Sequence, residues 1–265
     1  EISAKIHPRS SKRVTVTLSD NWDFYFYTID EKLASVFLDL GIADGAPLKE
    51  YQNLAYVRVF MNQPRADGLS SNDETDFLNT LEDQLESTLS ADDASVYVGR
   101  STCDGYRDFY FYASDTNDWS STVTEVMSEF PSYKFEQGSS PDDDWELFFD
   151  FLFPSEMNWQ VIQNRRVCEN LENKGDSFNE EREIDHWAYF PDQESLKAFE
   201  TKVLDLGFKL CGYTGVEEEQ REFGIHVSKV DLLSYETIDD ITLPLFDLAK
   251  ELGGEYDGWT TSVVT

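Results

Sequence analysis

The stretch DHWAYFPDQESLKAFETKVLDLGF, residues 185–208, decides the fold of the second half of the chain. Its first six residues form a short aromatic run typical of a strand, which Pro191 ends. Asp192 stands where a helix N-cap is expected, and Gly207 stands where that helix would end. Between them, apolar residues recur at helical spacing: Leu196, Phe199, Val203 and Leu206. The stretch therefore predicts a strand followed by an amphipathic helix.

The residues that follow predict two more strands, a second helix and a last strand. Residues 208–213 and 223–232 suit strands, and the acidic loop TGVEEEQRE between them suits a hairpin. Thr237 opens the next helix, in which Pro244 either introduces a kink or moves the true start to a later residue. The paired glycines that begin at Gly253 end this helix, and EYDGWTTSVV is the last strand. The order is βαββαβ, the ferredoxin-like plan with both helices on one face of an antiparallel sheet.

The first half repeats the same order of elements. Its expected strands are 54–61, 96–103, 107–113 and 133–137. One helix follows a predicted capping box of Ser71 and Glu74, and the second begins at Trp119. Further strands are expected to extend this sheet: 14–18, 22–28 and 145–153.

The predicted fold class is therefore α+β, with two tandem ferredoxin-like domains. We expect a flexible arm over residues 1–13, a first domain over residues 14–157 and a second over residues 158–265. A helix over residues 158–173 opens the second domain.

The pentapeptide DFYFY occurs twice, at Asp23–Tyr27 and at Asp108–Tyr112. Strand alternation sends Phe109 and Phe111 to one face and the two neighbouring tyrosines to the other. The simplest interpretation places the phenylalanines in the core and the tyrosines on an open sheet face. A protein-binding face is a second interpretation. Stacking of RNA bases is a third, but base stacking acts beside a basic groove, which this sequence does not offer.

Charge is the strongest global signal, since 53 acidic residues stand against 21 basic ones for a net charge of −32. Residues 1–157 carry 30 acidic and 11 basic side chains, and residues 158–265 carry 23 and 10, so both halves are acidic. Such a surface repels nucleic acid and anionic membranes and attracts basic segments of proteins. The alternative is that acidity only confers solubility. The chain has no apolar run of membrane-spanning length and no apolar signal-peptide core, so we expect a cytoplasmic protein.

The residues that carry catalytic or metal chemistry form no recognised pattern. Three widely spaced cysteines lack zinc-site spacing and are expected to be reduced: Cys103, Cys168 and Cys211. The acidic runs Asp142–Asp144 and Glu217–Glu219 are typical of solvated loops. His186 and His226 fall on neighbouring strands and could share the open face, but they lack a clear third ligand. We therefore predict no metal, no cofactor and no enzymatic activity.

Three motifs carry a resemblance to a known family. DHWAYFP at residues 185–191, the helix end at residues 206–208 and above all GGEYDGW at residues 253–259 resemble the regulator of ribonuclease E activity B (RraB) family. The resemblance covers about residues 158–264. It implies a small acidic protein that binds endoribonuclease E, inhibits or remodels its RNA-degrading assembly and is not itself an enzyme. The first part of the chain resembles a bacterial domain family of unknown function (695), which implies no activity.

The GGEYDGW motif also has a physical interpretation. Gly253 suits the left-handed residue that ends a helix, and Asp257-Gly258 predicts a turn or bulge that re-aims Trp259. Tyr256 and Trp259 then either close the sheet against the last helix or line a surface for a partner.

We predict an acidic, non-catalytic regulator that binds a basic region of a ribonuclease E-like enzyme, or of its scaffold, and inhibits or modulates its activity. No direct contact with nucleic acid or membrane is expected. The predicted protein-binding residues are Asp185, His186, Trp187, Tyr189, Glu255, Tyr256, Asp257 and Trp259. Two alternatives stay open: an acidic interaction module for another basic protein, and a small-molecule or hydrolase site on an open sheet face. The residues that would line such a site are Tyr25, Tyr27, Tyr110 and Tyr112.

Overall fold

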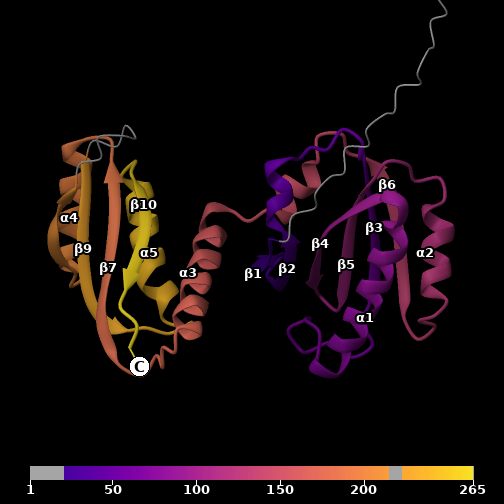
Figure 1. Ribbon diagram of the computed structural model, residues 1–265, viewed down its shortest axis with the longest axis horizontal. Helices are drawn as coiled ribbons and strands as arrows, with labels where there is room; N and C mark the ends of the chain where they lie inside the picture. Colours follow the sequence, from indigo (N-terminus) through magenta and orange to yellow (C-terminus); the bar gives the residue numbers. More distant parts are fainter. Residues whose placement is uncertain (1–20, 215–222, 265) are drawn as a thin grey trace, which may run out of the picture. The chain divides into compact units, whose positions relative to one another are not determined.

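The chain divides between Phe153 and Pro154 into two units, each with its own sheet (Figure 1). The structure is a computed structural model that describes residues 21–214 and 223–264. The arm expected over residues 1–13, the strand expected over residues 14–18 and the acidic run Glu217–Glu219 lie outside the described residues.

The first unit is a six-stranded antiparallel sheet in the order β1-β2-β4-β5-β3-β6. Its strands are β1 (Trp22–Ile29), β2 (Lys32–Asp39), β3 (Asn53–Phe60), β4 (Ser95–Cys103), β5 (Tyr106–Ala113) and β6 (Lys134–Pro141). Its helices are α1 (Asn72–Leu89) and α2 (Trp119–Met127), with short turns η1 (Leu40–Asp44), η2 (Ala91–Asp93) and η3 (Phe148–Leu152). Strands β3 to β6 with the two helices give the βαββαβ order, which confirms the ferredoxin-like prediction for this half.

The β1–β2 hairpin extends this sheet beyond β4. The strand predicted over residues 22–28 is β1, but its partner β2 was not predicted from the sequence. The strand predicted over residues 145–153 was wrong, because residues 148–152 form the π-helical turn η3 instead. The LFFDFLF run therefore folds as a short helical segment, whose apolar side chains need not alternate.

Helices α1 and α2 cover one face of the first sheet (Figure 1). Their buried leucines and valines pack on alternate residues of the central strands, including Phe109 and Phe111, as the alternation predicts. The N-terminus of α1 departs from the prediction. Ser71 is the N-cap but its side chain makes no capping hydrogen bond, so the predicted capping box was wrong. Glu74 is drawn away because its carboxylate accepts hydrogen bonds from the backbone N–H groups of Asn62 and Gln63.

The second face of the first sheet carries buried tyrosines, not open ones. Tyr110 and Tyr112 are almost fully buried, because the segment that contains η3 lies over them. Trp145 stacks on Tyr112 with ring centroids 3.9 Å apart, and its indole N–H donates to the backbone of Tyr51. Tyr25 is also buried and donates its hydroxyl to the carbonyl of Leu152 at 2.9 Å.

Two expectations for the DFYFY strands are therefore corrected. The first copy is inverted: Tyr25 points inward, while Phe24 and Phe26 are 38% and 50% exposed. Tyr25, Tyr110 and Tyr112 are buried and do not line an open face. The small-molecule site proposed among the tyrosines therefore has almost no exposed surface to which a ligand could bind. The tyrosines are buried because the segment that contains η3 packs on them and supplies acceptors for their hydroxyls. A tyrosine ring is readily buried once its hydroxyl has an acceptor.

The second unit is a four-stranded antiparallel sheet in the order β10-β7-β9-β8, with helices packed on one face. Its strands are β7 (Glu181–Phe190), β8 (Lys209–Thr214), β9 (Phe223–Leu232) and β10 (Glu255–Thr261). Its helices are α3 (Glu156–Asn173), α4 (Gln193–Asp205) and α5 (Ile238–Glu251). The element order from β7 to β10 again confirms the βαββαβ prediction.

The local signals in this unit form as the sequence predicts. The Asp192 side chain accepts a hydrogen bond from the Ser195 backbone N–H at the start of α4. Pro244 lies inside α5 and does not move its start, which is Ile238. Gly253 ends α5 with a positive φ of 71°. In the described ranges, no helix combines the length and the apolar character needed to cross a bilayer.

Candidate protein-binding face

The predicted protein-binding residues come together on β7 and β10, which are neighbours in the second sheet. They do not share one surface, however, because alternation divides them between the two faces. His186, Tyr256 and Trp259 lie on the face that the helices cover. Asp185, Trp187, Tyr189 and Glu255 lie on the opposite face, which we call the open face.

His186 is a core residue. Its side chain is 1% exposed, and its Nδ1 lies 2.8 Å from the hydroxyl of the buried Tyr256. Its Nε2 is buried and has no hydrogen-bond partner among the described residues. Burial lowers the pKa of His186 from 6.5 to about 4, because a charged imidazole would lose its hydration. Burial likewise raises the pKa of Tyr256 well above its ordinary value.

Trp259 is half-buried between the sheet and α3. The predicted β-bulge forms at Asp257, with the pairing shifted between Tyr256 and Gly258. After it, Trp259 pairs with His186 on the helix-covered face, and its indole N–H donates to Asn164 Oδ1 at 2.8 Å. The ring therefore lies on the helix-covered face, as in the first of the two interpretations, but its hydrogen bond is to α3 and not to the last helix, α5, that the interpretation named.

The open face combines aromatic rings with carboxylates. Trp187 stacks on His226 of β9 with ring centroids 4.6 Å apart and an angle of 11° between the planes. His226 Nε2 lies 2.6 Å from Asp185 Oδ1. Around this pair stand further acidic side chains from β7 and β10: Glu181, Glu183, Glu255 and the bulge residue Asp257.

Exposed apolar side chains extend the same face along β9. Val230 is 60% exposed and Leu232 is 41% exposed, and they pair with Glu183 and Glu181 of β7. Aliphatic, aromatic and acidic groups thus alternate over a surface that the helices do not cover. Such a mixture is typical of a surface that recognises a protein segment with basic and apolar side chains.

The two histidines considered together in the sequence do not share a face. His186 points into the core and His226 points to the open face, because they lie at positions of opposite parity in neighbouring strands. The structure instead brings His226 together with Asp185 and Cys211. Sequence spacing could not reveal this group, because its members are 26 and 15 residues apart and meet only through strand pairing.

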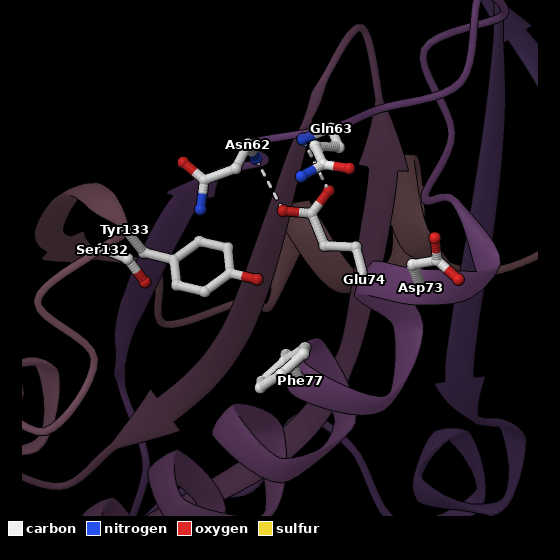
Figure 2. Close-up of a pocket in the computed structure, with 7 residues that line it drawn as sticks. All are labelled: Asn62, Gln63, Asp73, Glu74, Phe77, Ser132 and Tyr133. Carbon is white, nitrogen blue, oxygen red and sulfur yellow. Dashed lines mark hydrogen bonds between the residues drawn. The ribbon is translucent and has the colours of Figure 1, made fainter.

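The first unit offers a small pocket at the start of α1 (Figure 2). Its volume is about 220 Å³, and Glu74, Phe77 and Tyr133 are prominent in its lining. Figure 2 shows the Glu74 carboxylate directed at the backbone of Asn62 and Gln63, with N–O distances of 2.6 and 3.0 Å. Burial raises the pKa of Tyr133, and the nearby Glu74 carboxylate raises it further. Both Glu74 oxygens accept from the chain itself, so this carboxylate acts first as a support for the loop.

The acidic run at residues 142–144 also has a structural role. Asp142 accepts the hydroxyl of Tyr112 at 2.6 Å and the backbone N–H of Glu146 at 2.8 Å. Its carboxylate therefore fixes the segment that covers the tyrosines. The expectation of a fully solvated loop was wrong for this first aspartate.

The chain is thus a two-unit α+β protein whose second unit presents an acidic and aromatic open sheet face. It belongs to the family of unknown function DUF695, whose model matches residues 20–153. A second family model, Regulator of ribonuclease activity B, matches residues 161–261. These matches confirm the family resemblance of both halves.

Comparison with individual proteins adds little. The crystal structure of an unknown protein from Galdieria sulphuraria is 7% identical, with 80% of this chain and 99% of that chain covered and a TM-score of 0.23. The structure of a putative glycine cleavage system transcriptional repressor is 8% identical, with 80% and 98% covered and a TM-score of 0.23. TM-scores this low support no conclusion. No curated protein matches the chain.

Proposed function

We propose that this protein is an acidic, non-catalytic regulator that binds a ribonuclease E-like enzyme, or its scaffold, and lowers its activity in the cytoplasm. The single observation that carries the proposal is the match of residues 161–261 to the ribonuclease-regulator family. That range includes β7 to β10 and both helices between them, so the whole βαββαβ unit takes part in the match.

The open face of the second unit is the docking surface in this proposal. Its carboxylates attract a basic segment over distances of about a Debye length, roughly 8 Å at physiological salt. Trp187 and Tyr189 then supply most of the contact energy, because aromatic rings at the centre of an interface are the usual hot spots. The exposed Val230 and Leu232 accommodate apolar side chains of the same segment.

Inhibition in this scheme needs no chemistry from the regulator. A net charge of −32 keeps RNA phosphates away from the chain, so the regulator competes for a basic surface that would otherwise hold RNA or another component of the assembly. Occupying that surface displaces the competitor, and the nuclease loses substrate or scaffold contacts.

The decisive experiment compares two tryptophans on opposite faces of one sheet. Binding of the full chain to purified ribonuclease E is measured by calorimetry at low and high salt, for the wild type, Trp187→Ala and Trp259→Ala. We expect Trp187→Ala to weaken binding about tenfold to a hundredfold with a small loss of stability, as truncation of an interface hot spot does. Trp259→Ala should lower stability more and, in the fraction that stays folded, leave the affinity nearly unchanged.

Salt and nucleic acid supply the controls. Affinity for the enzyme should fall as salt rises, and single-stranded RNA should not bind at either salt concentration. An absence of binding to the enzyme would refute the proposed target. Salt-sensitive binding to a different basic protein would then favour the alternative of a general acidic interaction module. An equal loss of affinity in both tryptophan variants would move the docking surface away from the open face.

A further inference from the structure

Three side chains of different chemistry converge on the open face of the second sheet. They are the carboxylate of Asp185 on β7, the thiol of Cys211 on β8 and the imidazole of His226 on β9. One ligand atom from each lies within 4.8 Å of the other two. Strand β9 lies between β7 and β8, so the group spans three adjacent strands at one level of the sheet.

An irregularity in β8 brings the cysteine into this group. Leu210 pairs with Val227 in the core, Gly212 pairs with His226, and Cys211 is the extra residue between them. Its thiol donates a hydrogen bond to the Ser228 hydroxyl at 3.1 Å. The bulge therefore directs Cys211 toward the open face, where it is a free and exposed thiol.

The surrounding residues hold the three ligands in place. The flat stack of Trp187 on His226 restricts the imidazole to one plane. The hydroxyl of Ser228 joins the thiol of Cys211 to the carboxylate of Glu183, which accepts its hydrogen bond at 2.8 Å. Such outer hydrogen bonds and ring contacts orient metal ligands in known sites.

We propose that Asp185, Cys211 and His226 form a binding site for a single Zn²⁺ ion. One thiolate, one imidazole nitrogen and one carboxylate oxygen are all ligands that zinc accepts, whereas Mg²⁺ and Ca²⁺ prefer oxygen alone. Metal–ligand distances of 2.0–2.3 Å place tetrahedral ligand atoms roughly 3.3–3.8 Å apart. The ligand atoms lie within 4.8 Å of one another, so the widest separation needs to shorten by at most about 1 Å. His226 Nε2 and Asp185 Oδ1 are 2.6 Å apart and need to separate by roughly 1 Å. Rotation of the exposed Cys211 side chain and of the half-buried Asp185 carboxylate is sufficient for such movements.

The fourth position of this site faces away from the sheet. Among the described residues, no atom lies within 4 Å of a Cβ built on Gly212, the residue that pairs with His226, so β8 leaves space beside the imidazole. Water fills that position in the isolated protein. Three protein ligands with one open position are the pattern of accessible zinc sites, not of closed structural ones. The site thus adds an ion-binding activity to the face assigned above to a protein partner, and it stands independently of that assignment.

The metal itself is the probe in the first test. The full chain is stripped with a chelator and titrated with Zn²⁺ by calorimetry in excess Mg²⁺, which occupies weak carboxylate sites. We expect one Zn²⁺ per chain. Replacement by Co²⁺ should give the near-ultraviolet thiolate-to-metal absorption of a cysteine ligand. Cys211→Ser, Asp185→Asn and His226→Gln should each weaken binding at least tenfold, as the loss of one ligand from a three-ligand site does.

Glu181→Gln is the matched control, since it neutralises an exposed carboxylate on the same strand and face without touching the three ligands. It should bind Zn²⁺ as the wild type does. Far-ultraviolet circular dichroism without metal checks that every variant is folded. Binding that is absent, or equal in all variants, would overturn the proposal, as would an equal loss in Glu181→Gln.

Alkylation of the thiol gives a second readout, which reports on Cys211 itself. Cys103 and Cys168 are buried, so iodoacetamide should label Cys211 first. One equivalent of Zn²⁺ should slow that labelling more than tenfold, and His226→Gln should remove the protection. Labelling at the same rate with and without Zn²⁺ would show that Cys211 is not a ligand and would overturn the proposal.

Discussion

Burial of His186 makes the stability of the second unit sensitive to mild acid. The imidazole has a pKa of about 4 in the folded protein against an ordinary 6.5. Between these values the unfolded chain binds a proton that the folded chain excludes, so stability falls as the pH is lowered from 6.5 toward 4. Above pH 6.5 both states are neutral and the full stability is kept.

The size of this effect follows from the shift. A difference of 2.5 pKa units corresponds to about 3 kcal/mol once the pH reaches 4. By pH 5, which stays above the sequence pI of 4.2, about 2 kcal/mol should already be lost. Neighbouring groups change the pKa of His186 in both directions. The Asp185 carboxylate raises it by favouring the charged imidazole, while His226 and Lys229 lower it.

The assay is urea denaturation from pH 8 to pH 5, followed by tryptophan fluorescence, for the wild type and His186→Gln. Glutamine keeps a polar partner for the Tyr256 hydroxyl but cannot titrate in this range. All other titrating groups are shared, so the difference in unfolding free energy between the two proteins isolates His186. That difference should shrink by about 2 kcal/mol between pH 8 and pH 5.

A direct titration of the imidazole by NMR should place its midpoint far below 6.5. Parallel pH profiles for the two proteins, or an imidazole that titrates near 6.5, would refute the assignment of His186 to the core. The residue would then be accessible, and its exclusion from the docking surface would be mistaken.

Three further substitutions test the buried polar contacts, each by urea denaturation. Asp176→Asn leaves the buried Arg182 without its counter-ion and should lower the free energy of unfolding by on the order of 3–5 kcal/mol. The double variant with Arg182→Met should recover part of that stability. No recovery would show that the unpaired charge is not the cause of the loss. Tyr112→Phe removes the hydroxyl that binds Asp142 and should lower the free energy of unfolding by about 1–2 kcal/mol. Amide exchange in the η3 segment should become faster. Unchanged exchange there would show that the Tyr112 hydroxyl does not hold this segment in place. Glu74→Gln leaves one of two loop N–H groups without its acceptor and should cost about 1–2 kcal/mol, and a neutral result would show that the loop is held by other contacts.

The sequence predicted the two βαββαβ units because their local signals agree with their tertiary packing. The Asp192 cap of α4 bonds to a backbone N–H three residues away, and Gly253 ends α5 through its own positive φ. Both features depend only on residues close in the sequence. The bulge in GGEYDGW forms for the same reason, since Gly258 tolerates a φ of 112°. Features of this kind are encoded where they occur.

The candidate site was harder to predict because it depends on which face each residue occupies. The motif residues from 185 to 189 are consecutive, yet alternate ones point in opposite directions. The alternation along a strand does not by itself say whether the odd-numbered or the even-numbered side chains are buried. A histidine or a tyrosine is found in either environment. Cys211 joins the open face through an extra residue in β8, and no periodic pattern in the sequence marks that bulge.

The two units share the βαββαβ topology but differ in whether the sheet face opposite the helices is covered. In the first unit, the segment from Asp142 to η3 covers that face, with Trp145 stacked on Tyr112. In the second unit, the corresponding face carries the exposed Val230 and Leu232 as well as Trp187, and no helix or strand among the described residues of that unit covers it. An exposed surface of this composition is costly to leave bare unless it binds something. A partner is therefore expected on the second sheet, and the first unit, whose equivalent face is already filled by its own chain, is expected to act through other surfaces.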